Sequence, residues 1–130
     1  MMRAVDTYPL ASFPTLAVPD PAAAARWYRR ALGFSTVHER PGLDGTPVLV
    51  HLRRGRQQDL MLEASPGQHG PRGGPGVTLT FWVDDDLDAL ARRARAAGAG
   101  LVDGPVVRPW GAELIVVDPD GYRLVFGRGG

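Results

Sequence analysis

Two tryptophans stand at positions where flat aromatic side chains could bind a small molecule. Trp82 lies near the end of an apolar run, and Trp110 lies within a Pro-Trp-Gly sequence. Their indole faces could sandwich a planar or heteroaromatic ligand. The alternatives are packing at a core or dimer interface for Trp110 and simple barrel packing for Trp82. Trp27 lies within a helical pattern, where we expect it to belong to the core.

A histidine and two carboxylates could supply polar chemistry beside these aromatic residues. His51 lies in one apolar run, and Asp59 and Glu63 lie in the next. The carboxylates could bind a cationic ligand or act as a general base. Alternatively, the histidine is structural or solvated and the carboxylates are exposed charges at strand ends. No histidine has a sequence neighbour that suggests a catalytic triad, although partners could be distant in sequence.

Composition excludes several other classes of protein. The chain has 130 residues and no cysteine, so we expect a single domain, without disulfides, a thiol nucleophile or cysteine-bound zinc. Its formal charge of +1 gives little attraction to nucleic acid. No stretch approaches the roughly 20 apolar residues of a membrane span, and the segment 1–10 lacks the apolar centre of a secretory signal. We therefore expect a cytoplasmic protein.

The elements that must position these residues occur twice. Three markers recur at the same offset of about 65 residues: Val18 and Val83, Asp20 and Asp85, and Gly33 and Gly98. Each set comprises the end of an apolar strand, an acidic residue and a glycine after an alanine-rich helix. The periodicity predicts strands at 12–18, 34–40, 46–53 and 57–64, with a helix at 21–32. In the second copy it predicts strands at 77–83, 101–102, 106–108, 112–117 and 122–126, with a helix at 85–97.

Two segments of the chain resemble the glyoxalase/bleomycin resistance/dioxygenase class, the vicinal-oxygen-chelate superfamily. LAVPDPAAAARWYRRALGF resembles the opening of its module, and PWGAELIVVDPDGYRLVF resembles the closing signature of the bleomycin-resistance branch. The resemblance extends from Phe13 to Gly127. It implies an α+β fold of two tandem βαβββ modules, about 11–64 and 77–127 with a linker at 65–76, whose sheets line a concave cavity. It also implies a homodimer.

Many members of this superfamily bind a divalent metal through His and Glu on the first and last strands of each module. The resemblance places these positions at Phe13, Met61, Thr78 and Val125. None is a normal ligand, since a metal site needs several oxygen or nitrogen donors. A register slip would recruit only Glu63. We therefore expect no metal and no cofactor.

Alternation along the strands then predicts which side chains line the cavity. Neighbours two residues away from the four metal positions share their face, whereas Leu16, Val18, Leu79, Phe81, Leu124 and Phe126 should form the core. The predicted ligand-binding residues are Trp110, Trp82, Phe13, Thr78, Thr80, His51, Met61, Asp59, Glu63 and Val125.

The function predicted from these residues and the resemblance is metal-free binding of a small molecule. The chain would sequester an antibiotic or another natural product, without catalysis. Its near-neutral charge argues against bleomycin itself, because the family's bleomycin-binding proteins tend to be acidic. One alternative is a glyoxalase-like or dioxygenase-like enzyme, either metal-dependent or using His51, Asp59 or Glu63. Another is an accessory protein that binds a metabolite for regulation or transport.

Overall fold

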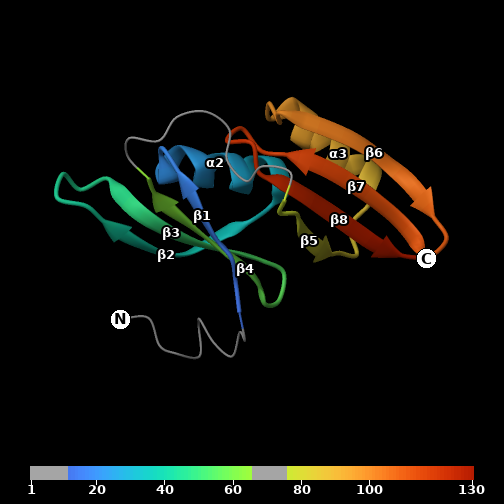
Figure 1. Ribbon diagram of the computed structural model, residues 1–130, viewed down its shortest axis with the longest axis horizontal. Coiled ribbons are helices and arrows are strands. Elements are labelled where there is room, and N and C mark those ends of the chain that lie inside the picture. The colour runs from blue at the N-terminus through green and yellow to red at the C-terminus, as the bar shows by residue number, and fades with distance from the viewer. Residues whose placement is uncertain (1–11, 66–75) are drawn as a thin grey trace. The chain divides into compact units, whose positions relative to one another are not determined.

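The computed structural model describes residues 12–65 and 76–130 (Figure 1). The prediction for the segment 1–10 and most of the predicted linker at 65–76 lie outside these described residues. Within them, no helix is both long and apolar enough to cross a bilayer. The chain forms two compact units. The two modules are therefore described one at a time.

The first module is a four-stranded sheet with one helix. In chain order it contains β1 (Thr15–Val18), α2 (Pro21–Leu32), β2 (Ser35–Pro41), β3 (Pro47–Arg54) and β4 (Gln58–Ala64). The strand order is β1-β4-β3-β2, with β1 parallel to β4 and the other pairs antiparallel. This is the βαβββ order, in which the helix carries the chain from the first strand to the far edge of the sheet.

Helix α2 begins and ends where its sequence predicts. The side chain of Asp20 accepts a hydrogen bond from the backbone N–H of Ala23 (3.1 Å), and Pro21 occupies the first turn. Gly33 ends the helix with a positive φ of 76°, a conformation that glycine adopts without a steric penalty. Trp27 and Tyr28 are buried and contact each other edge to face. The prediction that Trp27 belongs to the core is confirmed.

The second module repeats the plan. It contains β5 (Leu79–Trp82), α3 (Leu87–Ala96), β6 (Leu101–Arg108), β7 (Gly111–Val117) and β8 (Arg123–Gly129), with strand order β5-β8-β7-β6. Strand β5 is parallel to β8, and α3 contacts β6 and β7. Asp86 caps α3, because its side chain accepts from the backbone N–H groups of Asp88 and Ala89. The two-module α+β fold is thereby confirmed.

The sequence prediction of two short strands near 101–102 and 106–108 is wrong. A single strand, β6, runs through both, and its register against β7 shifts between Asp103 and Val106. Gly104 and Pro105 made this stretch resemble a break, because a proline cannot donate to the ladder and a glycine favours turns. The irregularity accommodates both residues, so the strand continues.

In each sheet, one face is apolar and buried with the module's helix. Of the six predicted core residues, five are buried and Leu79 is partly exposed. We call the opposite face the helix-distal face. In the first module it carries His51, Arg53, Asp59, Met61 and Glu63; in the second it carries Thr80, Trp82, Glu113, Ile115, Val125 and Gly127.

Candidate ligand-binding site

A polar cluster occupies the helix-distal face of the first module. Strands β3 and β4 are joined by a tight turn around Gly55, and their antiparallel register places Arg53 opposite Asp59 and His51 opposite Met61. Side chains two residues apart on a strand share a face, so these residues lie together. The sequence therefore brings a guanidinium, an imidazole and a carboxylate into contact through one short hairpin.

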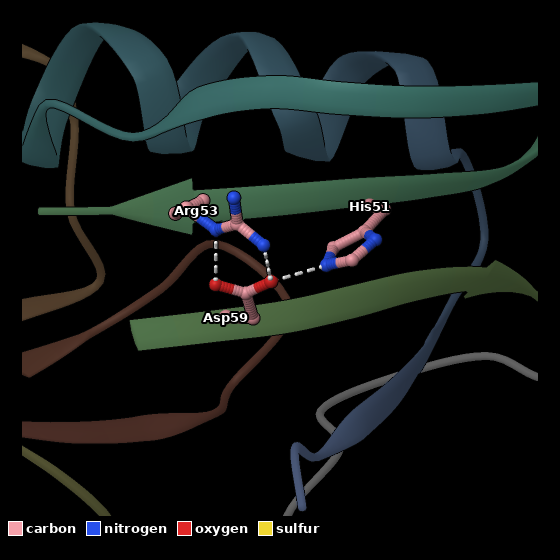
Figure 2. Close-up of polar contacts among 3 residues, drawn as sticks. All are labelled: His51, Arg53 and Asp59. Carbon is pink, nitrogen blue, oxygen red and sulfur yellow. Dashed lines mark hydrogen bonds and ion pairs between the residues drawn. The ribbon is translucent and has the colours of Figure 1, made fainter. Parts of the chain in front are cut away.

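The carboxylate of Asp59 is the centre of this cluster (Figure 2). Nε of Arg53 donates to its Oδ1 at 2.8 Å, and Nη2 donates to its Oδ2 at 3.0 Å. His51 Nε2 lies 2.5 Å from the same Oδ2. Asp59 is 4% exposed and His51 is 1% exposed. The two-pronged contact of a guanidinium with a carboxylate is a strong, directional pairing, and here it balances a buried charge.

The cluster fixes how His51 is presented. A carboxylate can only accept, so Nε2 of His51 carries the proton that it donates to Asp59. The other ring nitrogen points away from Asp59 (Figure 2). Phe13 stacks on the imidazole with ring centroids 5.7 Å apart and an angle of 23°. Asp59 already balances Arg53, whereas Glu63 is exposed, so the two carboxylates have different environments.

An exposed pair of aromatic side chains marks the second module. Trp82, the last residue of β5, is 60% exposed, and Trp110, in the β6–β7 turn, is 45% exposed. Their ring centroids are 5.2 Å apart, and the rings meet at 72°. A parallel sandwich needs roughly 7 Å between the two indoles, twice the contact distance of carbon atoms. The prediction that a ligand lies between them is therefore wrong: the rings form a corner, which we call the tryptophan corner.

Trp110 is held in place by the glycine that follows it. Gly111 has a φ of 151°, and a Cβ at this residue would lie 2.1 Å from the backbone oxygen of Arg128. Only glycine lets β7 begin so close to β8. The carbonyl of Trp110 also accepts from the backbone N–H of Gly130 at 3.1 Å. The Pro-Trp-Gly motif thus sets the backbone beneath an exposed indole.

A surface ion pair spans the same turn. Nε of Arg108 donates to Oε1 of Glu113 at 2.6 Å, with both side chains partly exposed. Such exposed pairs contribute at most about 1 kcal/mol to stability. This pair therefore balances charge near the tryptophan corner more than it stabilises the turn.

The remaining predicted site residues have mixed exposure. Thr80 pairs with Val125 across β5 and β8; Thr80 is exposed and Val125 is buried. Thr78 precedes β5 and is exposed, and Met61 is partly exposed. Two hollows lie elsewhere: one of about 660 Å³ beside the start of α2 and the β2–β3 turn, and one of about 280 Å³ between α3 and β6. None of the ten predicted residues lines either hollow.

Comparison with known proteins identifies the family. The sequence profile of the Glyoxalase/Bleomycin resistance protein/Dioxygenase superfamily matches residues 11–126. The chain belongs to this superfamily. This superfamily includes both enzymes and resistance proteins. Membership therefore does not decide whether the chain catalyses a reaction, and that must be argued from the site.

Three similar proteins illustrate the range of the superfamily. The anthracycline biosynthesis protein DnrV of Streptomyces peucetius is 30% identical over 127 residues, a match covering 88% of this chain and 45% of DnrV. The crystal structure of TioX from Micromonospora sp. ML1 is 29% identical with a TM-score of 0.71, covering 92% of this chain and 99% of TioX. TnmS3, an antibiotic binding protein from Streptomyces sp. CB03234, is 24% identical with a TM-score of 0.64, covering 95% and 99% of the two chains. This last similarity concerns the fold.

The residues that the sequence resemblance assigns to the superfamily's metal positions do not fit a divalent metal. Phe13 and Val125 have no donor atom, and Met61 and Thr78 offer a thioether and a single hydroxyl. Across residues 12–65 and 76–130, no three His, Asp or Glu side chains gather as a metal site would require. The described residues do offer stacking on indole rings, hydrogen bonding and a histidine oriented by a carboxylate.

Two contributors to the site were missed from the sequence. Arg53 was not predicted to belong to the site. In the hairpin register that pairs His51 with Met61, Arg53 pairs with Asp59. The register alone would have found this partner. Gly111 could have been suspected from its position after the turn, but its close approach to β8 depends on a non-local contact.

Proposed function

We propose that this protein binds a planar aromatic natural product, such as an antibiotic, without a metal ion and without transforming it, so that binding sequesters the compound. The observation that supports this most is the tryptophan corner. Indoles that are 60% and 45% exposed keep large apolar surfaces in water, and covering them with a flat ligand is favourable.

The relatives give this proposal its chemical direction. DnrV, a protein of anthracycline biosynthesis, is 30% identical to this chain, although the match spans less than half of DnrV. TnmS3 binds an antibiotic, so the shared fold is able to host such a ligand. The superfamily to which the chain belongs also includes bleomycin resistance proteins.

Charge matching within each module favours recognition by shape over recognition by charge. Arg53 is paired with Asp59, and Arg108 with Glu113, so these charged groups are balanced within the protein. The net charge of +1 adds little long-range steering. We therefore expect binding of a planar ligand to depend weakly on salt concentration.

We further propose that the binding form is a cytoplasmic homodimer, the assembly implied by the resemblance in sequence. Sedimentation equilibrium across protein concentration should give twice the chain mass of 14.0 kDa. A mass of one chain at micromolar concentration would contradict the dimer while leaving ligand binding to be measured directly.

Calorimetric titration tests the binding function. Protein dialysed against a chelator is titrated with daunorubicin as an anthracycline, with other planar antibiotics, and with a non-planar aminoglycoside. We expect at least one planar compound to bind stoichiometrically, and Trp110→Ala and Trp82→Ala each to weaken it at least tenfold. Leu101→Ala is the matched control, because Leu101 is an exposed apolar residue of the same module outside the corner. The proposal would be contradicted if no planar compound of the panel binds, or if both tryptophan variants bind as tightly as the wild-type protein.

A second candidate function is catalysis at His51. The contact that favours it is the hydrogen bond that fixes the imidazole against Asp59, an arrangement that orients a general base. The 1% exposure of His51 weighs against direct contact with a substrate. Incubating a bound planar compound with the protein and analysing it by mass spectrometry separates the two functions. Conversion that His51→Ala abolishes would favour the enzyme, and recovery of unchanged compound would favour sequestration.

A further inference from the structure

Trp82 lies directly over Gly127 of the neighbouring strand. The two residues are register partners in the parallel pair β5 and β8, and the backbone N–H of Val83 donates to the carbonyl of Gly127 at 2.8 Å. A Cβ built on Gly127 would lie 3.1 Å from Cζ3, 3.2 Å from Cε3 and 3.5 Å from Cη2 of Trp82. The six-membered part of the indole therefore occupies the space above the glycine.

The indole, and not the backbone, is what requires a glycine at this position. Gly127 is absent from the residues of the described chain that have a positive φ, so an L-residue could adopt its conformation. In the middle of a strand, glycine is less stable than alanine by roughly 0.5–1 kcal/mol. Gly127 is buried although Trp82 above it is mostly exposed, as expected if the ring covers the glycine.

The corresponding place in the first module has the opposite arrangement. There β1 and β4 pair in the same parallel register, with Ala17 opposite Glu63. A small residue faces a long one in both modules, but the long residue is on the last strand in the first module and on the first strand in the second. A side chain at position 127 would stand where the Trp82 ring lies.

We propose that Gly127 is a positioning residue for Trp82: it lets the indole lie against β8, so that Trp82 and Trp110 present a corner of 72° to one face and one edge of a planar aromatic ring system. This inference rests on the proposed function and specifies it. A ligand stacks on one indole and meets the other at its edge, which selects a flat fused-ring system over a globular apolar molecule.

Gly127→Val tests the inference, with Gly129→Val as its matched control. Gly129 lies two residues along the same strand, on the same face, and a Cβ there meets nothing within 4 Å. Valine favours strands, so neither change opposes β8 itself. Only the change at residue 127 should displace Trp82. Gly127→Ala is a milder variant for the case that Gly127→Val folds poorly. Its single methyl group would displace the Trp82 ring by only a few tenths of an ångström.

Circular dichroism without ligand gives the first readout, because two indoles in contact at 72° couple their electronic transitions. We expect Gly127→Val to remove the coupled signal that Trp110→Phe also removes, and Gly129→Val to retain it. The second readout is the calorimetric affinity for the planar compounds of the panel. We expect a loss of about tenfold for Gly127→Val, two- to threefold for Gly127→Ala, and none for Gly129→Val, as the loss of one aromatic pair would produce.

The two readouts separate this inference from the function on which it rests. If the wild-type protein binds no planar compound, the proposed function fails, and the spectrum still decides whether Gly127 positions Trp82. If the wild-type protein binds and Gly127→Val keeps both its affinity and its coupled signal, the inference is overturned and the function stands. A lost signal with unchanged affinity would also overturn it, since the ligand would not be using the corner.

Discussion

The two modules share one backbone plan but carry different chemistry on their helix-distal faces. At the position where β3 and β4 pair Arg53 with Asp59, the second module pairs Val117 with Arg123. His51 pairs with Met61 in the first module. The equivalent pair in the second module is Ile115 with Val125. The first module thus carries a buried, balanced polar cluster, and its counterpart in the second carries apolar side chains and one exposed arginine.

The parallel strand pairs β1–β4 and β5–β8 also differ, but here the second module carries the larger, aromatic side chain. Where the first module has Ala17 opposite Glu63, the second has Trp82 opposite Gly127. The faces toward the helices remain apolar in both, with Leu62 and Phe126 fully buried. The comparison teaches that burial against a helix constrains one face of each repeat, whereas the other face is free to specialise. We interpret the polar face as structural support and the aromatic face as the ligand-binding surface.

The largest expected effect comes from removing the centre of the polar cluster. Asp59→Ala removes the carboxylate that accepts from the buried His51 and from Arg53, and we expect the free energy of unfolding to fall by about 3 kcal/mol. Urea unfolding measures this. The matched variant Arg123→Ala removes the exposed residue at the equivalent position and should change stability by less than about 0.5 kcal/mol. Equal losses in the two variants would remove the contrast between the faces.

The next effect concerns the backbone beneath Trp110. A methyl group at residue 111 would meet the backbone of β8 at 2.1 Å, so Gly111→Ala must displace a strand. We expect a loss of about 2 kcal/mol in the free energy of unfolding. Gly129→Ala, which adds a methyl group to open space on the partner strand, is the control. A variant at 111 as stable as the control would show that the turn does not depend on this glycine.

Truncating the tryptophan corner should affect binding far more than stability. Trp82→Ala and Trp110→Ala remove partly exposed side chains, so each should lower the free energy of unfolding by only about 1 kcal/mol. Phe126→Ala, which empties a fully buried site, should cost about 3 kcal/mol or more. Thermal unfolding of the three variants ranks them. If the tryptophan variants prove as unstable as Phe126→Ala, the corner is part of the core.

The smallest expected effect is a change in the pKa of Asp44, in the β2–β3 turn of the first module. Hydrogen bonds from the Thr46 side chain and backbone hold the pKa of Asp44 below its ordinary value of 3.8. Because the folded state lowers this pKa, the contribution to stability is present above pH 4 and is lost as pH falls through the lowered value. Thr46→Ala should move the pKa of Asp44 upward in a carbon-13 NMR titration. An unchanged pKa would show that the side-chain hydrogen bond does not hold Asp44.

Much of the fold was predictable because its signals are local. Asp20, Pro21 and Gly33 identify the bounds of α2, and alternation identifies the strands. The 65-residue repeat then gives the topology. The continuity of β6 was not predictable, because the pairing that accommodates Gly104 and Pro105 is made with β7.

The site was less predictable than the fold. The two exposed tryptophans could be selected by residue type, but the 72° angle between their rings depends on side-chain torsions and on the space above Gly127. Likewise, His51 and Asp59 could be placed on one face by alternation, whereas their burial depends on neighbours distant in sequence, such as Phe13. Patterns along the chain identify faces, and contacts between elements determine what those faces can bind.

The most direct test of the account is an NMR measurement on chelator-treated protein saturated with the tightest planar ligand of the panel. The account predicts intermolecular nuclear Overhauser effects from ligand aromatic protons to the indole protons of both Trp82 and Trp110. It also predicts none to Leu101, which is exposed in the same module. Binding that disappears when metal is removed would contradict it, as would ligand contacts that leave both indoles untouched.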